Sequence, residues 1–139
     1  MKNLFLITVL VSVSFSGLHA QKKTHHHKTT RSVTSARKSI IRYGTASFYA
    51  KKFNGHRTAS GARYNSTKFT AACNVLPLNT WIKVTNLKNQ KSVIVIINDR
   101  MHAKNKRLVD LSKDAAKKLE YTGKGVAHVK VEVLPGFQP

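Results

Sequence analysis

The chain has 139 residues, enough for one domain with a modest hydrophobic core. Its 25 Lys and Arg residues outnumber five acidic residues and give a formal charge of +20 at pH 7. This charge attracts polyanions such as anionic lipid, anionic wall polymers or nucleic acid. The only cysteine is Cys73, which excludes an intramolecular disulfide, so the stability of the fold must come from its core.

The N-terminus has the features of a secretory signal peptide over residues 1–20. Lys2 precedes an apolar run over residues 4–13, and small and polar residues follow up to Ala20. This run is too short to cross a bilayer, which takes about 20 apolar residues. No cysteine near the expected cleavage site could carry a lipid anchor. We therefore expect a soluble exported protein of the periplasm or cell envelope, with neither a membrane span nor a lipid anchor.

Residues 21–43 form a basic segment of low hydrophobicity. They contain seven Lys or Arg residues, many Ser and Thr residues, and no acidic residue, which predicts a flexible linker. Three consecutive histidines, His25, His26 and His27, could hold a transition metal, but a metal site needs fixed spacing on a rigid element. We expect a solvated tail, no metal site and no cofactor. The basic charge either marks a specific anionic partner or reflects a general bias, and the sequence leaves both open.

Short strand patterns separated by turn residues dominate the rest of the chain. They cover residues 45–50, 81–85, 107–110 and 126–133, and the last of them has one apolar face. The unbroken apolar run at 93–97 predicts a central strand over 92–98 that is buried on both sides. Ser112 is expected to cap a short helix that runs through residues 115–119. Five or six strands with one helix favour a small closed barrel over a sandwich, because closure removes exposed strand edges.

Seven segments of the chain resemble the rare lipoprotein A family in order and spacing. They are Gly44-Thr-Ala-Ser-Phe-Tyr49, Phe53-Asn-Gly-His-Arg-Thr-Ala-Ser-Gly61, Thr70-Ala-Ala72, Leu76-Pro-Leu78, Val84-Thr-Asn-Leu87, Asn98-Asp-Arg100 and Asp110-Leu-Ser112. The resemblance implies an all-β fold over residues 44–134, a six-stranded double-psi β-barrel similar to barwin and expansin domains, with one short helix and a short tail at 135–139. It also implies an exported enzyme that cleaves peptidoglycan glycan strands without hydrolysis.

Such a lytic reaction needs an acid that protonates the departing glycosidic oxygen. The same group can then take the proton of the sugar's own 6-hydroxyl as an anhydro ring closes, so one carboxyl group suffices. Asp99 ends the most apolar strand pattern and matches the family motif, which makes it the predicted catalytic residue. A structural carboxylate that caps a turn or pairs with an arginine is the alternative. Asp110 also matches the family, and we expect it to support the site by fixing a loop.

The remaining acids, Asp114, Glu120 and Glu132, are expected on solvated faces of the helix and the last strand. The expected substrate-binding residues are Tyr49, Thr58, Gly61, Thr70 and Arg100 from the matched segments, together with Tyr64 between two of them.

The chain departs from the family pattern at groups usually assigned to catalysis. Ala62 stands where active members usually carry Glu, and Cys73 stands where they usually carry His. Alanine transfers no proton, and a thiol is a weaker hydrogen-bonding group than imidazole. Cys73 is more simply interpreted as a small buried hydrophobe. His102, in the segment that replaces the usual Gly-Pro, could supply an imidazole three residues from Asp99, but an exposed loop histidine is the simpler interpretation.

Two functions therefore stay open. The protein is either a peptidoglycan lytic transglycosylase that relies on Asp99, with Cys73 and His102 as further candidates, or a barrel that binds glycan without cutting it. The expected partners are peptidoglycan glycan strands or other anionic envelope polymers, and we expect a monomer. Specific nucleic-acid binding would rest on charge alone, because no recognition motif is present. The chain ends soon after the expected barrel, so we expect no C-terminal SPOR domain.

Overall fold

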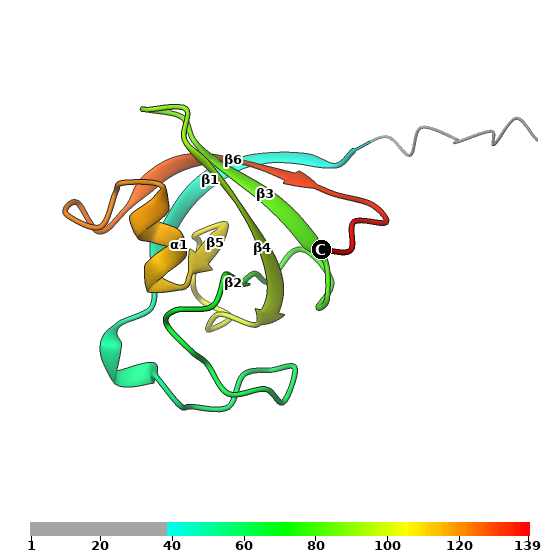
Figure 1. The fold of residues 1–139 in the computed structure, drawn as a ribbon, viewed down its shortest axis with the longest axis vertical. Coiled ribbons are helices and arrows are strands. Elements are labelled where there is room, and N and C mark those ends of the chain that lie inside the picture. The colour runs from blue at the N-terminus through cyan, green and yellow to red at the C-terminus, as the bar shows by residue number, and fades with distance from the viewer. Residues whose placement is uncertain (1–38) are drawn as a thin grey trace, which may run out of the picture. The chain divides into compact units, whose positions relative to one another are not determined.

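The computed structural model describes residues 39–139 of the chain. The expected signal peptide, the histidine run and the expected linker up to residue 38 lie outside the described residues. Six strands close into a barrel in the order β1-β5-β2-β4-β3-β6 (Figure 1). They are β1 (Ile41–Phe48), β2 (Thr70–Ala72), β3 (Trp81–Asn86), β4 (Ser92–Asp99), β5 (Val109–Leu111) and β6 (Ala127–Val133), and the helices are the 3-10 turn η1 (Lys51–Phe53) and α1 (Lys113–Lys118). The predicted six-stranded barrel with one short helix is confirmed.

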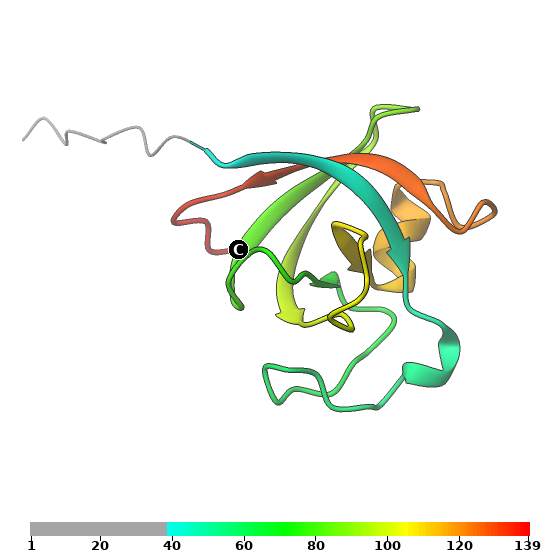
Figure 2. The same cartoon turned by 180° about the vertical axis from the view of Figure 1, so that it is seen from behind.

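The barrel mixes parallel and antiparallel strand pairs. The pairs β1–β5 and β2–β4 are parallel, whereas β1–β6, β2–β5, β3–β4 and β3–β6 are antiparallel. The long segment between β1 and β2, which contains η1, extends beyond one end of the barrel (Figure 2). The same end of the barrel receives the carboxyl ends of β1 and β4, so loops and strand ends meet there.

Strand β1 begins earlier than the sequence pattern indicates. Its pairing with β6 starts at Ile41↔Glu132 and continues to Ala46↔Ala127, so residues 41–43 belong to the barrel rather than to the linker. Backbone pairing with a long partner strand starts β1 before the first residue that its own alternation predicts. Strand β2 is absent from the strands predicted by alternation, because all three of its residues are buried and so short a strand shows no period.

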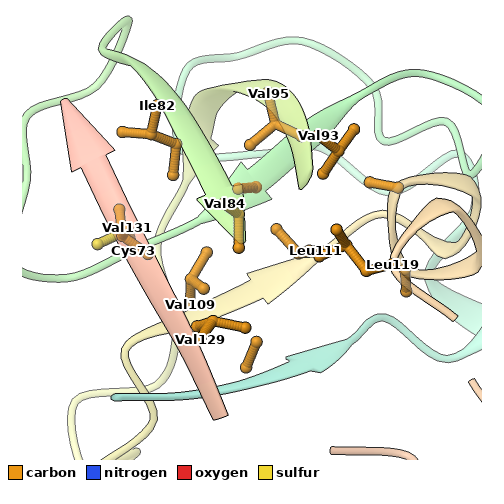
Figure 3. Close-up of a cluster of buried hydrophobic side chains, with 14 of the residues drawn as sticks. Cys73, Ile82, Val84, Val93, Val95, Val109, Leu111, Leu119, Val129 and Val131 are labelled. Carbon is orange, nitrogen blue, oxygen red and sulfur yellow. The ribbon is translucent and has the colours of Figure 1, made fainter. Parts of the chain in front are cut away.

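Alternating side chains of the strands fill the barrel interior (Figure 3). Residues 93, 95 and 97 of β4 point inward and meet residues 82 and 84 of β3 and residues 129 and 131 of β6. Cys73 is only 1% exposed and belongs to this hydrophobic cluster, as expected for a small buried hydrophobe. The barrel is thus a packed core rather than an open channel.

The prediction that the strand at 92–98 is buried on both sides is wrong. Val93, Val95 and Ile97 are buried, but Ile94 is 36% exposed and Ile96 is only half-buried. A continuous apolar run is typical of strands covered on both faces, and here only the interior face is covered. The outer face of β4 therefore carries apolar side chains that the barrel itself does not bury.

Helix α1 begins where the sequence predicts. The Ser112 hydroxyl accepts a hydrogen bond from the Ala115 backbone amide, which caps the first turn. Ala115 and Ala116 are buried against the core cluster, and Asp114 pairs with Lys117 on the solvent side at 2.9 Å. The predicted helix and its cap are confirmed.

Gly44 lies in β1 opposite Val129, and its position leaves no room for a side chain. A Cβ at residue 44 would lie 2.7 Å from the Cβ of Leu108, an atom that no change of rotamer can move away. We expect Gly44→Ala to lower the free energy of unfolding by about 1–3 kcal/mol, because overpacking forces a backbone shift. The measurement is the midpoint of thermal unfolding. Gly123→Ala is the matched control, since a Cβ there meets no atom within 4 Å. An unchanged midpoint for Gly44→Ala would contradict the close packing of β1 against residue 108.

Candidate functional site

A cavity of about 620 Å³ lies at the barrel end where β1 and β4 terminate. Its lining combines aromatic rings, three arginines, two histidines and two carboxylates. The residues are Phe48, Tyr49, Ala50, Phe53, His56, Arg57, Tyr64, Asp99, Arg100, Met101, His102, Asn105, Arg107 and Asp110. We call this cavity the groove. Apolar rings with a few converging polar groups are typical of a ligand site.

Hydrogen bonds to both carboxylate oxygens fix the side chain of Asp99. Its Oδ2 accepts from the Tyr49 hydroxyl at 2.7 Å. Its Oδ1 accepts from the backbone amides of Ala59 and Arg100, each at 2.8 Å. Within residues 39–139 the Tyr49 hydroxyl is the one donor recorded for Oδ2, so a lone pair of Oδ2 remains for a proton or a ligand.

Tyr49 is itself held between neighbouring rings of the groove. Its ring stacks on Tyr64 with centroids 4.5 Å apart, and Phe53 meets it edge-on at 5.9 Å. Burial, followed by the hydrogen bond to the Asp99 carboxylate, raises the pKa of Tyr49 well above its usual value. The hydroxyl therefore stays protonated and remains a donor to Asp99.

A tight turn at residues 58–62 carries the Ala59 amide to Asp99. The Thr58 hydroxyl donates to the Ala62 carbonyl at 3.0 Å, and the Ser60 amide donates to the Asn98 carbonyl of β4 at 3.0 Å. Gly61 closes the turn at a φ of +87°, a conformation that side chains with a Cβ rarely adopt. The Thr-Ala-Ser-Gly segment thus acts on the groove through its backbone.

Arg100 borders the groove, and backbone carbonyls hold its guanidinium in place. Its guanidinium Nη1 donates to the Leu76 carbonyl at 2.9 Å and to the Cys73 carbonyl. The side chain thereby ties the end of β4 to the turn that follows β2. The Arg100 head group is partly occupied by these backbone contacts, although it still borders the groove.

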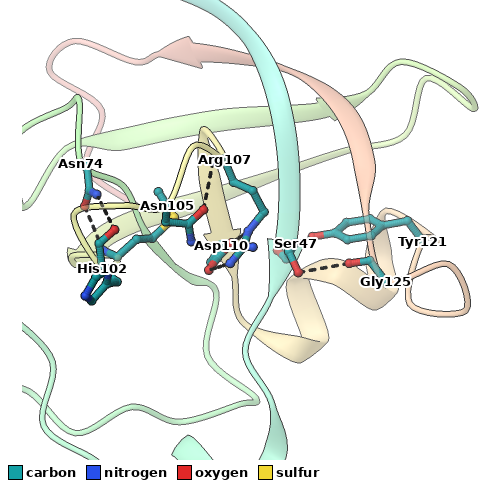
Figure 4. Close-up of polar contacts among 9 residues, drawn as sticks. Ser47, Asn74, His102, Asn105, Arg107, Asp110, Tyr121 and Gly125 are labelled. Carbon is teal, nitrogen blue, oxygen red and sulfur yellow. Dashed lines mark hydrogen bonds and ion pairs between the residues drawn. The ribbon is translucent and has the colours of Figure 1, made fainter.

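Asp110 contributes the second carboxylate of the groove and is paired with Arg107 (Figure 4). The guanidinium donates from Nε to Oδ1 and from Nη2 to Oδ2, both at 2.7 Å, in a two-pronged ion pair. This contact raises the pKa of Arg107. Asn105 Oδ1 accepts the Arg107 amide at 3.0 Å, which orders the β4–β5 loop.

The same loop contains His102, whose side chain is exposed at the edge of the groove. Its Nδ1 accepts the Lys104 amide at 3.2 Å, so that ring nitrogen is occupied within the loop. Asn74 fastens the loop to the segment after β2, since its Oδ1 accepts the Met101 amide at 2.9 Å (Figure 4).

The strand register sets the spacing of the two carboxylates. Ala72 of β2 pairs with Asp99 of β4 on one side and with Asp110 of β5 on the other. Adjacent strands lie about 4.8 Å apart, so the two Cα atoms are about 10 Å apart across β2. Asp99 and Asp110 therefore both line the groove, on two strands that are separated by β2.

The structure brings together part of the residue set expected from the sequence. Asp99, Tyr49, Tyr64, Arg100, His102 and Asp110 line the groove, whereas Thr58, Gly61, Thr70 and Cys73 do not. Thr58 and Gly61 form the turn behind Asp99. Thr70 is buried at the start of β2 and borders a separate cavity on the outer barrel wall, and the Cys73 side chain lies in the core.

Several groove residues escaped the sequence analysis. Phe53, His56 and Arg57 all lie inside a segment that matches the family, which was the available signal. Arg107 stands three residues before Asp110, a spacing that permits an ion pair.

Two further features concern residues 39–139, the described part of the chain. Within this part of the chain, no group of three or more His, Cys, Asp or Glu side chains is placed to hold a metal ion. Likewise, none of its helices has the length and apolar character required to cross a membrane.

Comparison with known proteins identifies the family. Residues 41–131 match the model of the double-psi β-barrel family described as lytic transglycolase. A relative from Pasteurella multocida named endolytic peptidoglycan transglycosylase RlpA is 49% identical over 117 residues, which cover 81% of this chain and 40% of the relative. A relative of the same name from Haemophilus influenzae is 50% identical over 106 residues, covering 76% and 37%.

Solved structures support the same fold. Expansin from Clavibacter michiganensis matches with a TM-score of 0.58 at 18% identity, covering 72% of this chain and 53% of the expansin. A mutant of a Clavibacter michiganensis expansin in complex with cellohexaose matches with a TM-score of 0.56 at 16% identity, with the same coverage. The barrel is therefore a double-psi β-barrel, as predicted.

The chain spans about two fifths of the length of the curated relatives it matches. The match nevertheless extends through all six strands, from β1 to β6. The seven segments recognised in the sequence and the matched barrel agree, and the chain belongs to the lytic transglycolase family that includes the rare lipoprotein A proteins.

Proposed function

We propose that the groove is the active site of an endolytic peptidoglycan transglycosylase, with Asp99 as the acid and base. The observation that carries the proposal is the setting of Asp99, which lines the groove while two backbone amides hold its Oδ1 and the Tyr49 hydroxyl donates to its Oδ2. The names of the relatives and the shared family support the reaction class.

One carboxyl group is sufficient for this reaction. Oδ2 of Asp99 delivers a proton to the glycosidic oxygen as the bond from that oxygen to the anomeric carbon breaks. The 6-hydroxyl of the same sugar attacks the anomeric carbon and closes an anhydro ring, and its proton returns to Asp99. Atoms balance without water, and Asp99 ends in its starting form.

The rest of the groove suits an anionic glycan. Tyr49 and Phe53 offer ring surfaces for sugars, and the buried Tyr64 supports the Tyr49 ring from behind. Arg57 and Arg100 offer positive charge to the carboxylates of the substrate. The expansin relative bound to cellohexaose is a protein of the same fold that binds a glycan. We further propose that the protein is exported and acts in the periplasm or cell envelope, which the signal-peptide pattern at residues 1–20 supports, and that it is a monomer.

A second function, glycan binding without cleavage, is favoured by two positions. The Cys73 thiol lies in the core and so does not substitute for a groove imidazole. Ala62 is exposed on the turn at 58–62 and offers no proton-transferring group. The proposed enzyme thus depends on Asp99 more heavily than relatives that carry Glu and His at these positions.

Asp99→Asn separates the two functions. The amide is nearly isosteric but cannot deliver a proton, and general acid catalysis is worth about 10²- to 10⁴-fold. We expect anhydro-muramic ends, measured by mass spectrometry of purified glycan strands, to fall by that factor. Asp114→Asn is the matched control, since this helix carboxylate lies outside the groove, and it should leave cleavage unchanged.

Full cleavage by Asp99→Asn would remove Asp99 from the mechanism. A wild-type protein that yields no anhydro ends at any pH tested, but sediments with glycan strands, would leave the binding function.

Tyr49→Phe tests how Asp99 is positioned. The phenyl ring keeps the stack on Tyr64, but Oδ2 of Asp99 loses its hydroxyl donor. A hydrogen bond to a charged group contributes about 1.5–3 kcal/mol, so we expect kcat to fall at least about tenfold with little change in KM. The measurement is the initial rate of anhydro-end formation over a range of glycan concentrations. A rise in KM at constant kcat would instead make Tyr49 a substrate-binding residue.

A further inference from the structure

The outer wall of β3 and β4 carries an apolar surface that the barrel leaves uncovered. Trp81 pairs with Ile96 and Lys83 pairs with Ile94 across the two strands, and these side chains alternate with the buried ones. Phe69, just before β2, is 38% exposed beside them. We call Phe69, Trp81, Lys83, Ile94, Ile96 and Lys118 the outer face. Antiparallel sheets usually present polar residues on a solvated face, so these apolar residues require an explanation.

Two adjoining hollows make the outer face continuous. One of about 390 Å³ is bordered by Trp81, Ile96 and Phe137, and the other of about 450 Å³ is bordered by Lys83 and Lys118. Phe69 and Ile94 border both hollows. The two hollows therefore adjoin at Phe69 and Ile94 on the outer wall, and the Phe137 ring packs edge-on against Trp81 at 5.5 Å at the border of one of them.

The charge around this surface has one sign. Lys68, Lys83 and Lys118 border the two hollows, and no acidic residue within 39–139 does. Lys118 lies over the Phe69 ring with its ammonium 5.1 Å from the centroid. Glu132, the register partner of Lys83 on β6, is already paired with Lys130 at 3.0 Å. An occupant of the outer face must therefore combine apolar groups with negative charge.

The candidate occupants differ in how well they meet this requirement. Residues 21–38 of the chain contain no acid, so their positive charge opposes the three lysines. A second copy is opposed by the same +20 charge. A glycan needs hydrogen-bonding partners, and Thr70 and Ser92 are the sole uncharged polar side chains among the described residues that border the hollows. A bilayer surface with anionic headgroups supplies both acyl chains and negative charge.

We propose that the outer face is a peripheral docking surface for an anionic phospholipid bilayer. Trp81 and Phe69 enter the interface between headgroups and acyl chains, where aromatic rings are favoured, and Ile94 and Ile96 follow them. The lysine ammonium groups meet the lipid phosphates. The groove lies at a barrel end and the outer face on the wall, so docking holds the barrel at the membrane without occupying Asp99.

Trp81 makes the proposal directly measurable, because it is the only tryptophan of the chain. The full chain is mixed with vesicles of 70% phosphatidylcholine and 30% phosphatidylglycerol, and tryptophan emission is recorded. We expect a shift to shorter wavelength, and quenching when the phospholipids carry brominated acyl chains. Pure phosphatidylcholine vesicles should give neither change. Absence of quenching with anionic vesicles overturns the proposal.

Two variants and a matched control test the residues. Lysine near an anionic membrane contributes about 1 kcal/mol, or about fivefold in affinity, so Lys83→Gln with Lys118→Gln should weaken vesicle binding about 25-fold. Ile94→Thr, which keeps a β-branched side chain, should reduce brominated-lipid quenching of Trp81. Lys88→Gln with Lys124→Gln removes the same charge at a different surface and should cost much less. Thermal unfolding of each variant checks that the fold is retained.

The remaining outcomes are decisive. Equal losses for the two lysine pairs would show that total charge, not the outer face, attracts the membrane. A loss of binding to purified glycan strands, with vesicle binding unchanged, would make the outer face a glycan surface. Either result overturns membrane docking and leaves the proposal for Asp99 unaffected.

Discussion

Barrel closure is the constraint on which the other features depend. Each strand of the closed barrel has two neighbours, so every strand must present an inward face that fills the interior. Val95, Ile97 and Val131 meet this requirement by alternation, and Cys73 lies among them as a free thiol. At Gly44, which lies beside Leu108, the packing leaves no room for a side chain.

Closure also builds the groove. The parallel pairing of β2 with β4 and the antiparallel pairing of β2 with β5 set Asp99 and Asp110 on either side of Ala72. The segment after β1 then crosses this barrel end and brings the Tyr49 hydroxyl and the Ala59 amide to the Asp99 carboxylate. The groups that contact Asp99 are therefore backbone amides and a tyrosine. Such a rigid setting suits Asp99 as the acid and base of an enzyme, and it equally suits a site that binds glycan without cutting it.

The basic charge of the chain is distributed over surfaces of different chemistry. Arginines gather at the groove, where Arg107 pairs with Asp110 and Arg100 ties down the turn after β2. Lysines instead border the apolar outer face. Guanidinium groups suit fixed, two-pronged contacts, whereas flexible ammonium groups suit a fluid anionic surface. The groove and the outer face therefore offer positive charge in two different forms.

Local patterns and motifs of fixed spacing predicted the alternation of several strands, the Ser112 cap, the family and the place of Asp99 at the end of a strand. The residues at 44–134 were therefore sufficient to predict a double-psi β-barrel. Which of the matched residues meet in the groove depends on the folded chain. Thr58 and Gly61 act behind it through a turn, and Cys73 lies in the core, because hydrogen bonds of the turn and packing of the core rather than sequence spacing set these positions. The apolar run at 93–97 could not be predicted correctly from the sequence for a related reason. Its composition indicates burial on both faces of the strand, but the cover of the outer face depends on neighbouring elements, which no local pattern encodes.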